Sequence, residues 1–380
     1  MEATNTAPAI LIDNPSSLTD LADTLSQYPS ISVDTESNSL YVYREQVCLI
    51  QISTADHDYL IDTLAIQDLS PLAKLFANPS QEKVFHASEY DIICMKRDYG
   101  FEFANLFDTM IAARILGEQS VGLASLLNTR LGIELNKKYQ RANWGIRPLP
   151  QAMLEYASQD SHYLYPLRLI LENELRENHL IELAREDFKL ACEVQAHSSN
   201  GTSCNLWKVA GATPLSPQEA AILNELCEYR ENEASRRNLP PFKIISNETL
   251  VRLSQLHPSS VSDLIGVKGL TVTMLERYGT GIFAAIYRGE TAPPIKRPRK
   301  IKPDEQYLNR LNALREWRKN KGLELKVESD VILPRDQVEL IASISPKTIE
   351  DLHVIMKDIP YRSKHFSKEI MSVLKKQEMV

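Results

Sequence analysis

The stretch Ile31-Ser-Val-Asp-Thr-Glu-Ser37 begins like a β-strand, but two acidic side chains interrupt it at Asp34 and Glu36. Side chains two positions apart in a strand point to the same face, about 6–7 Å apart along the chain. Two like charges on one partly buried face are unfavourable unless something binds them. These carboxylates are therefore candidates for a binding or catalytic site.

The residues around this stretch predict a domain that mixes strands and helices. Up to about residue 110, short strand-like and helix-like segments alternate along the chain. The strand-like segments are 9–13, 30–34, 47–53, 58–62 and 83–86, and helical spacing falls at 17–27 and 70–76. From Asp108 to Gln195 the pattern is mainly helical. This order predicts an α/β domain in which helices flank a mixed sheet.

The last part of the chain contains an internal repeat. Shifting residues 223–264 by 88 positions aligns ten identical residues without a gap, among them Arg230 with Arg318 and Pro258 with Pro346. Both copies have a helical pattern, and the proline-rich basic segment TAPPIKRPRKIKP separates them. We therefore expect three domains, the last two small and all-α. Their expected bounds are 1–200, 211–292 and 303–380.

Charge is distributed unevenly over the 380 residues. Residues 1–200 carry 28 acidic against 15 basic side chains, whereas residues 201–380 carry 22 against 28. The net charge of −7 argues weakly against nucleic-acid binding, but residues 201–380 carry a basic excess that could bind a polyanion. No apolar run approaches the ~20 residues of a membrane span, and MEATNTAPAI lacks the pattern of a signal peptide. With five scattered cysteines, we expect a cytoplasmic protein without membrane contact.

Several further acidic residues could belong to a site, but each one alone also fits an ordinary structural role. The segment Lys83-Val-Phe-His-Ala-Ser-Glu-Tyr-Asp91 predicts a strand followed by a helix, with Asp91 in the first helical turn. An acid there ordinarily serves only the helix dipole. Tyr156 and Asp160 stand four residues apart, which places phenol and carboxylate on one helix face. Alone, such a pair is more often a surface hydrogen bond, and Asp108 fits a helix N-cap.

The order of these groups is more specific than any one of them. An Asp-x-Glu strand, then an Asp after F-H-x-x-x-x-D, then Tyr-x-x-x-Asp resembles the three exonuclease motifs of the DEDD superfamily, tyrosine subtype. The segments DTMIAARILG, VGLASLLNTRLGIELNKKYQRANWGIRPLP and YASQDSHYLYPL are similar to ribonuclease D. This resemblance covers about residues 25–195 and implies a ribonuclease-H-like exonuclease domain. Residues 215–290 and 303–376 resemble HRDC domains, although the second lacks the glycine-rich turn and ERYG segment found at 266–279.

The resemblance implies a site for two divalent cations. Asp34 would bridge both ions, Glu36 and Asp160 would bind the ion that activates water, and Asp91 would bind the other. Tyr156 would orient the attacking water. The residue types agree, because clustered carboxylates repel one another and hard oxygen ligands favour Mg²⁺ or Mn²⁺ over zinc. Two such ions roughly 4 Å apart can activate water and stabilise a leaving 3′-oxygen.

The resemblance also indicates where the substrate would lie. Residues 137–147, just before the Tyr156 helix, interleave cations and aromatic rings that suit phosphates and bases. Leu40 and Tyr41 would wedge the terminal base. The full set of expected substrate contacts is Leu40, Tyr41, His86, Lys138, Gln140, Trp144 and Arg147. Two alternatives stay open: Trp144 as a core residue, and a structural hydrogen-bonded role for His86.

The function expected from the sequence is that of a 3′→5′ exoribonuclease, a hydrolase acting on structured RNA such as tRNA precursors. It would release nucleoside 5′-monophosphates, and its helical domains would hold RNA without an obligate protein partner. One alternative is the same chemistry on DNA, because no residue that senses the 2′-hydroxyl can be named. The other is a non-catalytic RNA-binding protein on a relic fold, which the presence of all five catalytic-type residues argues against.

Overall fold

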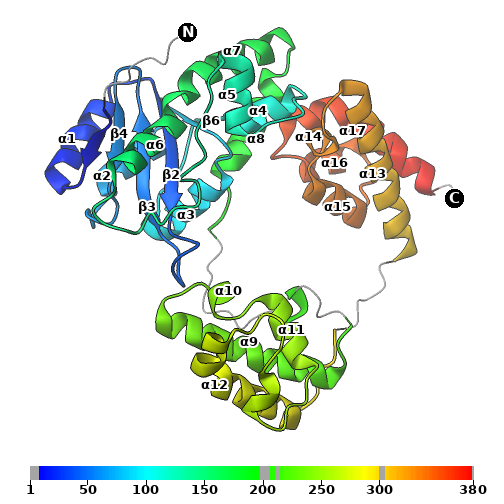
Figure 1. Cartoon of the computed structure of the whole chain (residues 1–380). Helices are drawn as coiled ribbons and strands as arrows, with labels where there is room; N and C mark the ends of the chain where they lie inside the picture. Colours follow the sequence, from blue (N-terminus) through cyan, green and yellow to red (C-terminus); the bar gives the residue numbers. More distant parts are fainter. Residues whose placement is uncertain (1–7, 197–205, 210–213, 299–303, 379–380) are drawn as a thin grey trace. The chain divides into compact units, whose positions relative to one another are not determined.

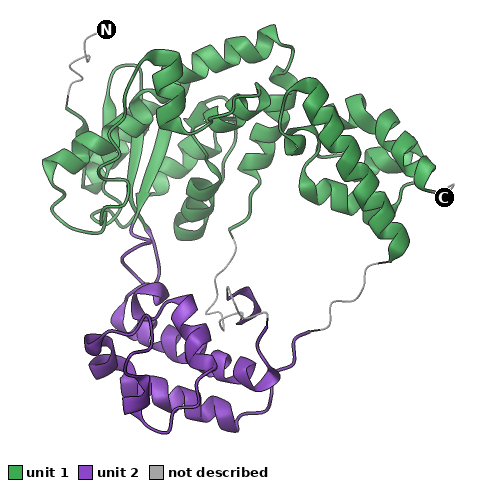
Figure 2. Cartoon of the chain, turned by 45° about the vertical axis from the view of Figure 1, so that its right-hand side comes forward, with its two compact units in different colours: residues 1–37, 47–197, 302–380 green, residues 38–46, 198–301 purple. Residues whose placement is uncertain are grey.

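The computed structural model describes residues 8–196, 206–209, 214–298 and 304–378 (Figure 1). The chain forms two compact units (Figure 2). The first comprises residues 1–37, 47–197 and 302–380, and the second comprises residues 38–46 and 198–301. The expected division into three domains stays a prediction.

In the first unit, the described residues contain one six-stranded sheet in the order β1-β4-β3-β2-β5-β6. Its strands are β1 (Ile10–Ile12), β2 (Ser30–Ser37), β3 (Val47–Ser53), β4 (Asp58–Ile61), β5 (Glu82–Phe85) and β6 (Leu106–Asp108). The pairs β2–β3 and β3–β4 are antiparallel, and the other pairs are parallel. The mixed sheet expected from the sequence is confirmed.

Helices cover this sheet, and its central strand β3 is buried on both sides. Every residue of β3 is buried. The helices around the sheet are α1 (Pro15–Leu25), α2 (Ser70–Ala77), α3 (Glu89–Tyr99), α4 (Thr109–Ile115), α5 (Leu123–Leu131), α6 (Gln151–His162), α7 (Leu164–Glu177) and α8 (Ile181–Cys192). Helix α6 contacts β2, β3 and β4, while α7 contacts β2 and β5 (Figure 1).

The C-terminal helices of the first unit pack against α8. These helices are α13 (Glu305–Leu325), α14 (Ser329–Ile332), α15 (Arg335–Ile344), α16 (Ile349–Ile355) and α17 (Pro360–Glu378). The Arg362 guanidinium, 0% exposed, donates to Glu186 at 2.5 Å and to Asp187 at 2.6 and 2.9 Å. A buried Arg with two carboxylate partners and the Val331 carbonyl is well satisfied. It joins the C-terminal helices to the helix that follows α7.

The second unit has its own helical core. Its helices are α9 (Pro217–Arg237), α10 (Pro241–Ile244), α11 (Asn247–Ser254) and α12 (Val272–Thr291), with short 3₁₀ turns at Leu206–Lys208 and Val261–Leu264. Leu223, Leu226, Leu250 and Ile282 are each 0% exposed and belong to one apolar cluster. The small all-α domain expected here is therefore present.

The internal repeat is visible in the helix boundaries. Helices α13 and α14 begin and end 88 positions after α9 and α10. The Arg230 guanidinium donates to the Ile245 carbonyl at 3.2 Å, and Arg318 donates to the Leu333 carbonyl, 88 positions later, at 2.9 Å. The two sets of helices thus share both bounds and an internal hydrogen bond. That the second set is also an HRDC domain stays a prediction.

Candidate active site

Strand β2 presents Asp34 and Glu36 on one face of the sheet. In the antiparallel pair β2–β3, Asp34 stands opposite Gln51 and Glu36 opposite Leu49. The register shifts between Glu36 and Ser37, where the strand ends. Because β2 pairs with β5 only over Ser30–Ser32, the acidic end of the strand lies beyond that pairing.

Helix α3 brings Asp91 to this end of the strand. The chain leaves β5 at Phe85, passes Ala87 in a left-handed conformation with φ of 58°, and enters α3 at Glu89. Asp91 is 7% exposed, and its carboxylate accepts a short hydrogen bond from the Thr35 hydroxyl. Thr35 lies between the two acids of β2, so this bond ties the strand to the helix.

Asp108 fixes the turn from which α3 starts. This carboxylate, 1% exposed, accepts hydrogen bonds from the backbone N–H groups of Ala87 at 3.1 Å and Ser88 at 2.7 Å. It also accepts from Met110 at 2.8 Å and Ile111 at 3.1 Å. The N-cap role expected for Asp108 at α4 is confirmed, and the same side chain additionally holds the Ala87–Ser88 turn.

Helix α6 contributes Tyr156 and Asp160 from above the β2–β3–β4 face. The Tyr156 hydroxyl donates a hydrogen bond to the Asp160 carboxylate. Two contacts fix the end of this helix on the sheet: Ser161 to Ser53 at 2.7 Å, and the His162 imidazole to the Asp58 carboxylate at 2.9 Å. The spacing of four residues therefore produces the expected shared face.

Burial and neighbouring charges raise the pKa values of the four acids. Burial, followed by the charges of Asp91 and Asp160, raises the pKa of Asp34 well above its usual value. Burial and the neighbouring acids raise the pKa of Glu36 to about 10. Burial raises the pKa of Asp91 to about 7 and that of Asp160 to about 6, although the Thr35 and Tyr156 hydrogen bonds oppose these shifts. Among the described residues, no Lys or Arg is a main cause of these four shifts.

This arrangement fits divalent cations in chemistry but is not a closed ligand set. In the part of the chain that the structure describes, no three His, Cys, Asp or Glu side chains are grouped closely enough to hold a metal ion as they stand. The donors are nevertheless all carboxylates, the oxygen ligands that Mg²⁺ and Mn²⁺ prefer. Partly buried carboxylates repel one another when no cation is bound, and a bound divalent ion compensates their charge.

Two of the expected substrate contacts, Trp144 and Arg147, have partners within the protein. Trp144 is 1% exposed, and its ring centroid lies 6.1 Å from that of Tyr156, so the alternative interpretation as a core residue matches its burial. The Arg147 guanidinium donates to Asp62 at 2.6 and 2.7 Å and to the Cys48 carbonyl at 2.8 Å. Their roles in substrate binding stay predictions.

The other expected contacts divide between the two units. His86 is half-buried, with its Nδ1 2.9 Å from the Thr109 hydroxyl, and burial lowers the pKa of the ring. Lys138 and Gln140 are exposed, and the Lys138 ammonium lies 5.1 Å from the Tyr139 ring centroid. Leu40 and Tyr41 belong to the second unit, where the Lys243 ammonium lies 4.3 Å from the Tyr41 ring centroid. None of these positions is yet assigned to substrate.

The sequence-based reasoning overlooked Gln51. This residue is 0% exposed in β3, opposite Asp34, and neither its amide nitrogen nor its amide oxygen has a partner in the described residues. Leaving a buried donor or acceptor unpaired costs about 1–3 kcal/mol. The signal was present in Val47-Cys-Leu-Ile-Gln-Ile-Ser53, where a single long polar side chain interrupts a fully buried apolar run.

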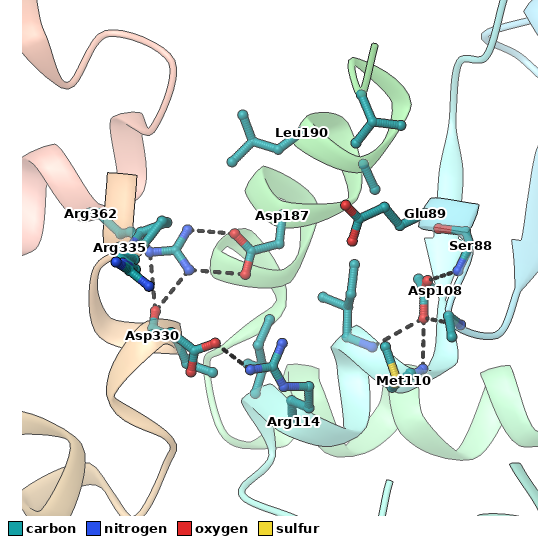
Figure 3. Close-up of a pocket in the computed structure, with 17 residues that line it drawn as sticks. Ser88, Glu89, Asp108, Met110, Arg114, Asp187, Leu190, Asp330, Arg335 and Arg362 are labelled. Carbon is teal, nitrogen blue, oxygen red and sulfur yellow. Dashed lines mark hydrogen bonds and ion pairs between the residues drawn. The ribbon is translucent and has the colours of Figure 1, made fainter. Parts of the chain in front are cut away.

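A separate cavity of about 380 Å³ borders the Ala87–Ser88 turn (Figure 3). Ser88, Glu89 and Asp108 line it on one side, and residues of α8 and the C-terminal helices line the other. The Arg114 guanidinium bridges the two sides by donating to Glu328 at 2.7 Å. Asp34, Glu36, Tyr156 and Asp160 do not line this cavity, so it is distinct from the acidic site.

Comparison with known proteins identifies the domains. A family model described as a 3′-5′ exonuclease matches residues 9–176, and an HRDC domain model matches residues 219–286. Among relatives, RRP6-like 1 of Arabidopsis thaliana is 30% identical over 294 residues, covering 74% of this chain but 46% of that protein. Ribonuclease D of Haemophilus influenzae is 30% identical over 318 residues, covering 81% of this chain and 78% of that protein.

A solved structure shows the same architecture. Escherichia coli RNase D is similar with a TM-score of 0.70 at 23% identity, covering 97% of this chain and 99% of that chain. The fold and the exonuclease model define the N-terminal part as a 3′-5′ exonuclease domain, to which an HRDC domain is joined. The chain belongs to the ribonuclease D family. It spans less than half the length of the Arabidopsis relative.

Proposed function

We propose that this chain is a 3′→5′ exoribonuclease that releases nucleoside 5′-monophosphates from the 3′ end of RNA. One observation carries the proposal: within a 3′-5′ exonuclease domain, β2, α3 and α6 bring four carboxylates together, so that burial and the charges of Asp91 and Asp160 raise the pKa values of Asp34 and Glu36. Relatives named ribonuclease D support RNA as the substrate. A hydrolase that uses divalent cations needs several carboxylate ligands in one site, which explains the cluster of acids.

We assign the metal-binding role to Asp34, Glu36, Asp91 and Asp160, with two Mg²⁺ or Mn²⁺ as the ions. Such ions supply a nucleophilic water at neutral pH and stabilise charge on the leaving oxygen. The chain's own part is to hold its ligands in place. The Thr35 hydroxyl orients the Asp91 carboxylate, and Asp108 fixes the turn that positions α3.

Tyr156 serves as a hydrogen-bond donor in this proposal. Burial, followed by the charges of Asp160 and Glu36, raises the pKa of its phenol above the usual value, so the hydroxyl stays protonated at neutral pH. A protonated phenol cannot remove a proton from water, but it can orient water or a phosphate oxygen. Its contacts with the rings of Tyr139 and Trp144, at centroid distances of 5.8 and 6.1 Å, fix its direction.

We further propose that the physiological substrates are structured RNAs such as tRNA precursors and that the HRDC domain contributes affinity rather than chemistry. The basic excess of residues 201–380 supports this, because phosphate contacts supply most of the affinity for nucleic acids. We place the protein in the cytoplasm: its five cysteines are scattered along the sequence without CxxC spacing, as in proteins of a reducing compartment. No helix in the described part of the chain is long and apolar enough to cross a membrane.

The test is a time course on a structured RNA labelled at its 3′ end, with Mg²⁺ and with EDTA. The proposal predicts that labelled nucleoside 5′-monophosphate is the first product and that EDTA abolishes it. Internal fragments as first products would contradict the direction of attack. A DNA strand of the same sequence is run in parallel, and faster cleavage of DNA would contradict the choice of RNA.

A further inference from the structure

The side chain of Gln51 lies on the same face of the sheet as Asp34, directly across from it in the neighbouring strand. Residues directly opposite each other in an antiparallel pair place their side chains on the same face, with Cβ atoms about 5 Å apart. Asp34 and Gln51 are such a pair, and Ser32 and Ser53 are the same-face pair that precedes them. Because Ser53 contacts Ser161 of α6, this face is the one turned toward Tyr156 and Asp160.

The polar groups of this face are not equally satisfied. Ser53 has its partner in Ser161 at 2.7 Å. By contrast, the Gln51 amide and the Ser32 hydroxyl have no partner in the described residues. Gln51 is the one buried residue in the described part of the chain whose side-chain nitrogen and oxygen are both unpaired. The two residues that flank Gln51 in β3, Ile50 and Ile52, are each 0% exposed and have no polar side-chain group.

A second buried glutamine shows what an ordinary structural role looks like. Gln81 is 2% exposed, and its amide nitrogen donates to the Leu25 carbonyl at 2.6 Å and to the Tyr28 carbonyl at 2.9 Å. Its amide therefore joins the end of α1 to the start of β5. The Gln51 amide makes no comparable connection, so the stability of the fold gives no reason for a polar side chain at that position.

We propose that Gln51 is a positioning residue for the metal site, with its amide N–H groups directed to the Asp34 carboxylate when that carboxylate binds the ions. The inference rests on the proposed function. Asp34 is the charged group directly across from Gln51, and a buried amide donor would hold one carboxylate oxygen so that the other faces the ions. Support of metal ligands by hydrogen bonds from neighbouring side chains commonly changes metal affinity 10–100-fold.

The experiment compares two apolar substitutions at Gln51 with the same substitution at Gln81. Gln51→Leu and Gln51→Met remove the amide and keep much of the volume, whereas Gln81→Leu removes an amide that serves only the fold. Three quantities are measured on the full chain: the melting temperature in EDTA, the dissociation constant of Mn²⁺ by calorimetry, and nucleotide release at saturating metal and RNA.

The proposal predicts opposite behaviour at the two positions. Both Gln51 variants keep or raise the melting temperature in EDTA, bind Mn²⁺ roughly 10-fold or more weakly, and lose at least 10-fold in nucleotide release. Gln81→Leu lowers the melting temperature but leaves Mn²⁺ binding and release within about two-fold of the unsubstituted protein. The proposal is overturned if Mn²⁺ binding by both Gln51 variants stays within two-fold of the unsubstituted protein. Since calorimetry needs no RNA, that result is distinct from a failure of the exoribonuclease assignment, which the unsubstituted protein tests.

Discussion

The Thr35 hydroxyl donates a short hydrogen bond to the Asp91 carboxylate, which joins the strand carrying Asp34 and Glu36 to the helix carrying the third acid. The bond stabilises the charged form of Asp91 and so opposes the rise in pKa that burial causes. It also restricts the carboxylate to one orientation. The geometry of the site therefore depends on a residue that binds no metal itself.

Replacing Thr35 tests this role. Thr35→Val keeps the shape of the side chain and removes the hydroxyl. We therefore expect a loss of about 1 kcal/mol in the free energy of unfolding and a roughly 10-fold weaker affinity for Mn²⁺. Urea unfolding and calorimetry measure the two effects. The control is Thr63→Val, which removes a buried hydroxyl that donates to the Val47 carbonyl at 2.6 Å. Equal Mn²⁺ affinity in both variants would show that Thr35 does not position Asp91.

Asp108 is predicted to support the site from a greater distance. Asp108→Asn keeps an oxygen that can cap α4 and accept from the Ala87 N–H, but an NH₂ group in place of Oδ2 cannot accept from the Ser88 N–H. We expect a loss of about 2–3 kcal/mol in stability together with reduced nucleotide release. Asp304→Asn, at the N-cap of α13, is the matched control and should change neither quantity. A stable Asp108→Asn protein with full activity would refute the role of the turn.

Tyr156→Phe separates orientation of the reacting groups from binding. Removal of the hydroxyl leaves the ring and its contacts with Tyr139 and Trp144 in place. Because the hydroxyl donates to Asp160 rather than serving as a base, we expect kcat to fall more than 10-fold while the dissociation constant for RNA changes less than about three-fold. Single-turnover kinetics and RNA titration measure the two effects. The reverse pattern would make Tyr156 a substrate contact.

The raised carboxylate pKa values predict how stability depends on pH without metal. An acid whose pKa is higher in the folded state binds more protons when folded, so its contribution to stability is present at low pH and is lost as pH rises. For Asp160 and Asp91 this contribution to stability is lost as the pH rises from about 4 toward their pKa values in the folded protein, about 6 and about 7. We therefore expect the melting temperature in EDTA to fall between pH 5 and pH 8 relative to Asp34→Asn. Added Mn²⁺ should reverse the fall at pH 8, and an identical pH profile in both proteins would contradict this account.

The sequence predicted the parts of the site that depend on local spacing. Asp34 and Glu36 share a strand face because side chains alternate, and Tyr156 and Asp160 share a helix face because they are four residues apart. The mixed sheet followed from the alternation of strand-like and helix-like segments. The assignment of these residues to metal and catalysis stays a prediction, which rests on the resemblance and on the proximity that the pKa shifts reveal.

The supporting residues could not be predicted in the same way. The role of Gln51 depends on the register between β2 and β3, and that of Asp108 depends on a turn 20 residues earlier in the chain. Arg147 lies in a basic and aromatic stretch, and its role in binding RNA stays a prediction. Its partner Asp62 is 85 residues away, and spacing along the chain carries no information about such a contact.

The central claim is that the carboxylate cluster binds the ions that cleave RNA. The most direct measurement compares Asp34→Asn with the unsubstituted protein for release of nucleoside 5′-monophosphate and for affinity toward the same RNA. We predict that release is abolished while the dissociation constant for RNA stays within about three-fold, because Asn keeps the shape but lacks the charge that holds divalent ions. Nucleotide release by Asp34→Asn at the unsubstituted rate would contradict the account.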